Sequence, residues 1–179
     1  MTLSPLDAGR DVGGLAIAAA EPFARFVLRA DEAARRAVAA AFKVDLPEKI
    51  NSAAAQAGRA ALKLGPDEWL LLAPQADGPI VAGSLAGALA QGAASLVDVS
   101  HRQIGLVVSG QRATSLLNGA MPLDLDETAF PVGMATRTVL DKAEIVLWRV
   151  GARRFHLEVG RSFAPYVTAL LDEIRAENV

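Results

Sequence analysis

Three residues near the middle of the chain carry the side chains of a nucleophilic triad: Asp98, Ser100 and His101. A working triad needs the carboxylate, the imidazole and the hydroxyl to meet in that order. Successive residues of a strand point to opposite faces of a sheet, so neighbours in sequence do not stack in this way. The chain also lacks the G-x-S-x-G turn that presents a nucleophilic serine. We therefore predict no catalytic residue, and expect the hydroxyl and the imidazole to tie a strand end to a loop.

Two charged clusters are the other candidates for ligand binding. Three arginines surround the last predicted hairpin: Arg153, Arg154 and Arg161. They could bind an anion, but charges at a solvated hairpin edge also prevent strand pairing, and we favour that interpretation. The acidic loop 124–127 lacks the alternating oxygen ligands of a calcium loop. The chain contains neither the G-x-G-x-x-G motif of dinucleotide-binding proteins nor the phosphate-binding motif G-x-x-x-x-G-K-[ST]. We therefore predict no metal or cofactor site.

Composition excludes several classes of protein. The 179 residues have a net charge of −2, which gives no electrostatic case for nucleic-acid binding. With no cysteine and two histidines, thiolate and multi-histidine metal sites are excluded. Residues 78–97 are uncharged, but Gly78–Pro79 and Gly92 enclose a helix too short to span a membrane. We expect a cytoplasmic protein without membrane or nucleic-acid partners.

The elements that must position these residues follow from hydrophobic spacing and turn residues. Strands are expected at 22–30, 58–64, 68–72, 96–99, 104–109, 134–140, 144–150 and 154–159. Helices are expected at 31–42, 80–91 and 111–119, and after Ser162. We expect residues 46–56 to form a loop, and 1–20 to form an N-terminal arm.

The two halves of the chain repeat this pattern. FVLRADEAARRA, from Phe26, matches LVVSGQRATSLL, from Leu106, at an offset of 80 residues. We therefore predict a single α+β domain, 1–179, with a mixed, mainly antiparallel sheet and flanking helices. After the arm, it would consist of two pseudo-repeated β-α-β-β lobes, 21–99 and 100–179. The stretch 96–110, which carries the residue types of a triad, would be the seam between them.

Several segments resemble a known family. DEWLLLAP, VDVSHRQIGLVVSG, PLDLD, FPVG, TRT and FAPYVTALLDEI resemble the gamma subunit of heterotetrameric sarcosine oxidase, from about Leu64 onward. The resemblance implies an accessory subunit of a complex that oxidises sarcosine to glycine. It also implies alpha, beta and delta partner subunits, which would carry FAD, FMN, NAD and zinc and use tetrahydrofolate, with no cofactor on this chain.

The same family is similar in fold to the folate-binding domain of the glycine-cleavage T-protein, an aminomethyltransferase. Asp98, Ser100 and His101 match the T-protein pattern D-x-S-H, and Gly110 matches its following glycine. The T-protein hairpin G-G-x-x-D-D is not matched at residues 139–144. A stand-alone folate-binding or one-carbon-transfer protein is therefore the alternative, and another N-methyl amine could replace sarcosine. The residues expected to act in structure or at an interface are Asp98, Ser100, His101, Arg102, Arg137 and Trp148.

Overall fold

The computed structural model describes residues 14–177, which form two compact units. The first unit comprises 21–100, and the second comprises 14–20 together with 101–177. The first contains β2 (Phe23–Ala30), α1 (Glu32–Phe42), β3 (Ser52–Gln56), β4 (Arg59–Lys63), β5 (Glu68–Pro74), a short 3-10 turn (Gln75–Asp77), α2 (Gly78–Leu89) and β6 (Ala94–Asp98). The second contains β1 (Ala16–Ala19), β7 (Gln103–Ser109), α3 (Ala113–Asn118), β8 (Ala135–Leu140), β9 (Ala143–Gly151), β10 (Arg154–Gly160) and α4 (Ala164–Glu177).

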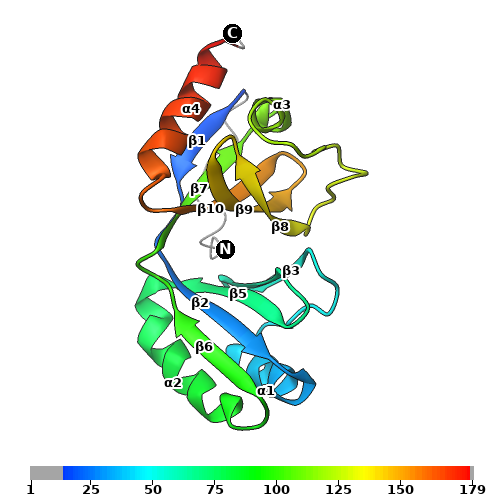
Figure 1. The fold of residues 1–179 in the computed structure, drawn as a ribbon, viewed down its shortest axis with the longest axis vertical. Helices are drawn as coiled ribbons and strands as arrows, with labels where there is room; N and C mark the ends of the chain where they lie inside the picture. Colours follow the sequence, from blue (N-terminus) through cyan, green and yellow to red (C-terminus); the bar gives the residue numbers. More distant parts are fainter. Residues whose placement is uncertain (1–13, 178–179) are drawn as a thin grey trace. The chain divides into compact units, whose positions relative to one another are not determined.

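The first unit is a five-stranded sheet in the order β3-β4-β5-β2-β6, with α1 and α2 side by side on one face (Figure 1). α1 begins at Asp31, whose carboxylate accepts a hydrogen bond from the Ala34 amide at 2.9 Å, as an N-cap should. Alternate residues of β2, such as Phe26 and Leu28, pack against the buried side of the helices. Fully burying one such side chain contributes about 1.5–3 kcal/mol.

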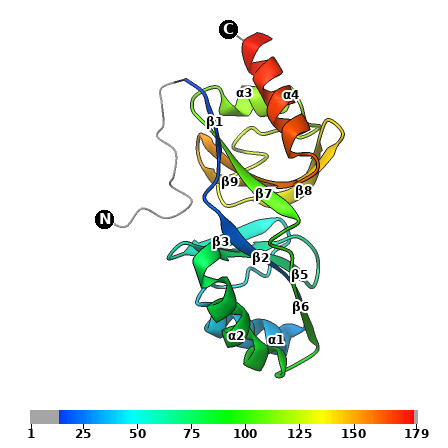
Figure 2. The ribbon, with the colours of Figure 1, turned by 90° about the vertical axis from the view of Figure 1, so that its left-hand side faces the viewer.

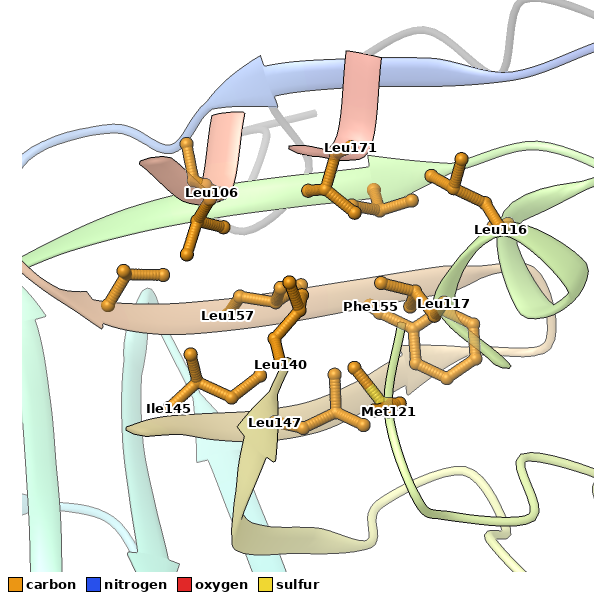
Figure 3. Packing of buried hydrophobic residues seen from close by; sticks show 14 of the residues in the cluster. Leu106, Leu116, Leu117, Met121, Leu140, Ile145, Leu147, Phe155, Leu157 and Leu171 are labelled. Carbon is orange, nitrogen blue, oxygen red and sulfur yellow. The ribbon is translucent and has the colours of Figure 1, made fainter. Parts of the chain in front are cut away.

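The second unit has the matching sheet order β1-β7-β10-β9-β8, with α3 and α4 beside it (Figure 2). Its core lies between the sheet and the helices (Figure 3). Leucines from three strands meet leucines from both helices there: Leu106, Leu147, Leu157, Leu117 and Leu171. Each unit therefore shows the order strand, helix, three strands and helix, which was expected for the second unit, whereas only two strands were expected between the helices of the first.

Each sheet takes its fifth strand from the other half of the sequence. In the sequence, β1 is followed directly by β2, but it pairs with β7. In the same way, β6 is followed by β7 but pairs with β2. Equivalent backbone bonds extend both pairings: Ala20 N donates to Gly105 O, and Val99 N donates to Arg25 O, each at 2.9 Å. The two repeats have therefore exchanged their first strands.

The α+β class and the flanking helices are confirmed, but three details differ from expectation. The strands form two sheets, and every pairing found among the described residues is antiparallel. Part of the expected loop 46–56 is β3, because the turn Ala57–Gly58, with positive φ at both residues, folds this alanine-rich segment against β4. Part of the expected arm is β1, and residues 1–13 lie outside the described chain. Among the described helices, none is long and apolar enough to cross a membrane.

Candidate functional site

Two residues of the D-x-S-H motif hold the end of β6. The Ser100 hydroxyl accepts a hydrogen bond from the Arg25 amide at 2.9 Å, and Asp98 Oδ1 accepts one from the Ser100 amide at 2.8 Å. Together with the bond from Val99 N to Arg25 O, they continue the pairing of β2 and β6 past the last residue of β6. The hydroxyl and the carboxylate thus bind backbone amides of the first unit.

His101, the last residue of the motif, and the following Arg102 belong to the second unit. Both side chains are exposed, and both residues are held through their backbone carbonyls. Arg161 Nε donates to His101 O at 3.2 Å, and Arg161 N donates to Arg102 O at 2.9 Å. These contacts involve the backbone carbonyls, and the role expected for the imidazole of His101 stays a prediction.

Arg137 and Trp148 lie on neighbouring strands of the second unit. Arg137 is exposed on β8, whereas Trp148 on β9 is 4% exposed. The Trp148 ring meets the His156 ring edge to face, with centroids 6.2 Å apart. Within residues 14–177, the buried Trp148 Nε1 has no hydrogen-bond partner. The two residues therefore do not share one environment, and only Arg137 faces solvent.

A buried histidine–glutamate pair on β10 was not foreseen from the sequence. His156 Nε2 and Glu158 Oε1 lie 2.7 Å apart, and both side chains are at most 1% exposed. Residues two apart on a strand share a face, so the H-x-E spacing within an apolar strand was the available signal. Removing one side chain of a buried hydrogen-bonded pair is costly, because the other loses a hydrogen-bond partner that water does not replace.

Arg149, also not singled out beforehand, fastens the loop between α3 and β8. Its guanidinium is 4% exposed and donates to the carbonyls of Leu125 at 3.0 Å, Phe130 at 2.8 Å and Ala152 at 2.6 Å. The same group lies over the Phe155 ring, 5.1 Å from its centroid. The loop held in this way carries the PLDLD and FPVG segments. An arginine inside the apolar run IVLWRV was the signal for this role.

The carboxylates of that loop are engaged in local turns. Asp124 Oδ1 accepts from the Asp126 amide at 2.9 Å, and Asp126 Oδ1 accepts from the amide and hydroxyl of Thr128 at 2.9 and 2.6 Å. The hydrogen bonds from Thr128 lower the pKa of Asp126. In the part of the chain that the structure describes, no group of three or more His, Asp or Glu side chains is arranged to hold a metal ion.

The hairpin that departs from the T-protein pattern is closed by a two-residue turn, Asp141–Lys142. Leu140 and Ala143 flank this turn opposite each other, and both are fully buried in the hydrophobic core. The Asp141 carboxylate accepts a hydrogen bond from the Tyr166 hydroxyl, which raises the pKa of Tyr166. This hairpin therefore carries apolar core residues and a surface hydrogen bond, whereas the T-protein pattern has glycines and carboxylates there.

Comparison with known proteins identifies relatives of this chain. Residues 28–177 match the model of the sarcosine oxidase, gamma subunit family. The sarcosine oxidase subunit gamma of Arthrobacter sp is 36% identical over 126 residues, which cover 70% of this chain and 61% of that relative.

Solved structures support the same relationship. The fold matches a chain of the heterotetrameric sarcosine oxidase from Corynebacterium sp. U-96, solved in complex with pyrrole 2-carboxylate, with a TM-score of 0.85 and 29% identity. That match covers 97% of this chain and 94% of the other. Aminomethyltransferase T of the glycine cleavage system from Bartonella henselae shares the fold alone, with a TM-score of 0.70 and 11% identity over 90% of this chain and 46% of that one. The chain thus belongs to the sarcosine oxidase gamma subunit family, as its motifs indicated.

Proposed function

We propose that this chain is the accessory gamma subunit of a heterotetrameric sarcosine oxidase, which demethylates sarcosine oxidatively to glycine. The observation that carries the proposal is the fold match to a chain of such a complex, with a TM-score of 0.85 over 97% of the residues. In this function the chain supplies no catalytic residue. It binds the alpha, beta and delta subunits in the cytoplasm and stabilises their assembly.

The chemistry then takes place on the partner subunits. These would carry FAD, FMN, NAD and zinc, and would pass the one-carbon unit to tetrahydrofolate. The roles of this chain's own polar groups support that division: Asp98 and Ser100 bind backbone amides, and His156 pairs with Glu158 in the interior. Polar groups that are hydrogen-bonded within the fold in this way suit a structural role.

The six residues named from the sequence divide into two proposed roles. Asp98, Ser100 and Trp148 would act within the fold, the first two at the end of β6 and the third as a buried side chain on β9. His101, Arg102 and Arg137 are exposed, and they would contribute to contacts with other subunits.

Assembly and activity test this function together. The chain is produced alone, the other subunits are produced without it, and all are produced together; peroxide formation from sarcosine is then measured. We expect turnover from the full set, none from the lone chain, and a less stable complex when the chain is omitted. Full turnover by the lone chain, or a complex indifferent to its omission, would contradict the proposal.

A stand-alone folate-binding or aminomethyltransferase-type protein is the second candidate, because the T-protein fold is shared. Calorimetry with tetrahydrofolate on the isolated chain distinguishes the two. Tight binding would favour this candidate, whereas we expect none from a hairpin whose flanking residues, Leu140 and Ala143, are core residues. Replacing sarcosine by other N-methyl amines in the assay of the assembled complex tests the substrate.

A further inference from the structure

The first unit contains a small cavity of about 340 Å³ that is lined mainly by charged side chains. α1 supplies Glu32 and Arg35 to its wall, β4 supplies Lys63, and β5 supplies Trp69. Glu48, in the loop between α1 and β3, completes the charged part of the wall. The volume is at the lower end of the range for ligand sites in proteins, so the cavity suits a small molecule.

Lys63 brings a buried ammonium group to this cavity. The residue is 5% exposed, its Nζ donates to the Pro66 carbonyl at 2.8 Å, and the same atom lies 3.8 Å from the centroid of the Trp69 ring. Within residues 14–177, no carboxylate lies within ion-pair distance of Nζ, and the hydrogen bond to Pro66 uses only one of its three N–H groups. Burial accordingly lowers the pKa of Lys63. Because buried charges in proteins are usually paired, this ammonium is suited to bind the carboxylate of a ligand.

The carboxylates of the cavity are arranged around Arg35. Both oxygens of Glu32 are engaged, since they accept hydrogen bonds from Arg35 Nε and Nη2, each at 2.8 Å. Glu48 offers only Oε1 to Arg35 Nη2, at 2.8 Å, and its side chain is 78% exposed. The second oxygen of Glu48 makes no hydrogen bond among the described residues. That oxygen is suited to bind the ammonium group of a ligand.

The wall of the cavity thus carries one cation and one carboxylate oxygen that no ion pair uses in the described chain. A ligand with a single charge would be attracted to one of these groups and repelled by the other. A free α-amino acid avoids this conflict, because it carries a carboxylate and an ammonium group on the same carbon atom.

A larger hollow, of about 680 Å³, shares Arg35 and Glu48 with this cavity. Its other charged side chains, those of Arg36, Lys43 and Asp45, are all exposed to solvent. Exposed charges are well hydrated and contribute little to binding, so this hollow lacks a buried group that would hold a ligand.

We propose that the cavity lined by Lys63, Trp69 and Glu48 is a binding site for a small zwitterionic amino acid. The carboxylate of the ligand binds the Lys63 ammonium, and the ammonium of the ligand binds Glu48. The site gives a ligand to a chain to which the proposed function assigns none. It does not depend on that function, because its residues all belong to the first unit and the full chain alone tests it.

Isothermal titration calorimetry of the full chain with glycine tests the site. For so small a ligand we expect a dissociation constant on the order of 1 mM. Acetate and methylamine each carry one of the two charged groups of glycine, and each should bind about tenfold more weakly or worse, because a charge-assisted hydrogen bond is lost. In a Trp148→Phe background, the fluorescence of Trp69 should change with glycine at the same midpoint.

Substitutions locate the ligand. Lys63→Met and Glu48→Gln keep the size of each side chain and remove its charge, and each should weaken glycine binding about tenfold or more. Lys49→Met and Asp45→Asn remove exposed charges of the same loop and should leave the affinity for glycine unchanged. Circular dichroism and melting establish that each variant is folded.

Several results would overturn the site. One is the absence of glycine binding at concentrations about tenfold above the expected dissociation constant. Another is acetate or methylamine bound as tightly as glycine, because a single charge would then suffice. Unchanged affinity in folded Lys63→Met and Glu48→Gln, or an equal loss in the two controls, would also contradict the proposal. The proposed function would stand in each case, since the assembly and turnover of the complex decide it.

Discussion

Replacing Arg149 by methionine should destabilise the second unit strongly. The guanidinium is buried and donates three hydrogen bonds to carbonyl oxygens, at 3.0, 2.8 and 2.6 Å. Hydrogen bonds of charged groups contribute about 1.5–3 kcal/mol each, so the gross loss is about 4–9 kcal/mol. Part of this loss of stability is offset, because Arg149→Met also removes the cost of burying a cation. The carboxylate partner of this cation, Glu127, is 3.9 Å away and exposed. The free energy of unfolding should fall by about 3 kcal/mol.

Urea unfolding followed by tryptophan fluorescence measures this loss. The chain has two tryptophans, one in each unit, so a Trp69→Phe background leaves Trp148 as the reporter of the second unit. Arg149→Met should lower the midpoint without changing the slope, and should expose the loop 121–133 to proteolysis. Arg149→Lys should be intermediate, because one ammonium cannot reach all three carbonyls.

Arg36→Met is the matched control for this experiment. The Arg36 side chain is 71% exposed and lies 3.7 Å from Glu32, so its loss should change stability by less than about 0.5 kcal/mol. If Arg149→Met cost no more than Arg36→Met, or if the loop 121–133 stayed protected, the guanidinium would not be what holds the loop.

Three further substitutions test the backbone conformation at two glycines and the N-cap of α1. Gly110→Ala should destabilise by about 1–3 kcal/mol, because φ is +115° and the new Cβ would lie 2.4 Å from Gly14 O. Gly83→Ala, with nothing within 4 Å, should stabilise by about 0.5–1 kcal/mol in the same thermal melts, and equal effects would contradict the reasoning. Hydrogen bonds from the amides of Ala34 and Ala93 lower the pKa of the Asp31 carboxyl group. The ionised carboxylate therefore stabilises the fold at pH values above its unfolded pKa, and this stability is lost as the pH falls through the folded pKa. The stability advantage over Asp31→Asn should therefore shrink in urea titrations between about pH 6 and pH 2, and a constant difference would argue against the cap charge.

The helices and most strands could be predicted because their signals are local. Asp31 before an apolar stripe indicates the start of α1, and the structure confirms it. β3 was missed because SAAAQ lacks the β-branched and aromatic residues typical of strands. Only its pairing with β4 makes that segment a strand.

The candidate site was predictable in composition but not in arrangement. The sequence pointed to Asp98, Ser100 and His101, and strand geometry argued against a triad among neighbours. It did not show that the Ser100 hydroxyl would accept the amide of Arg25, seventy-five residues away. Contacts over such distances along the chain leave no periodic signal.

By itself, the sequence determined the α+β class, the duplicated order of elements and the family, because spacing, turn residues and motifs are properties of short segments. The tertiary structure alone decided that β1 and β6 are exchanged between the two sheets, and that Arg149 fastens the loop 121–133. The same holds for Phe163 and Tyr166, which stay exposed while the other aromatic residues are buried. The physical reason is that strand partners and burial depend on which distant segments share a core, and local hydrophobic pattern does not specify that choice.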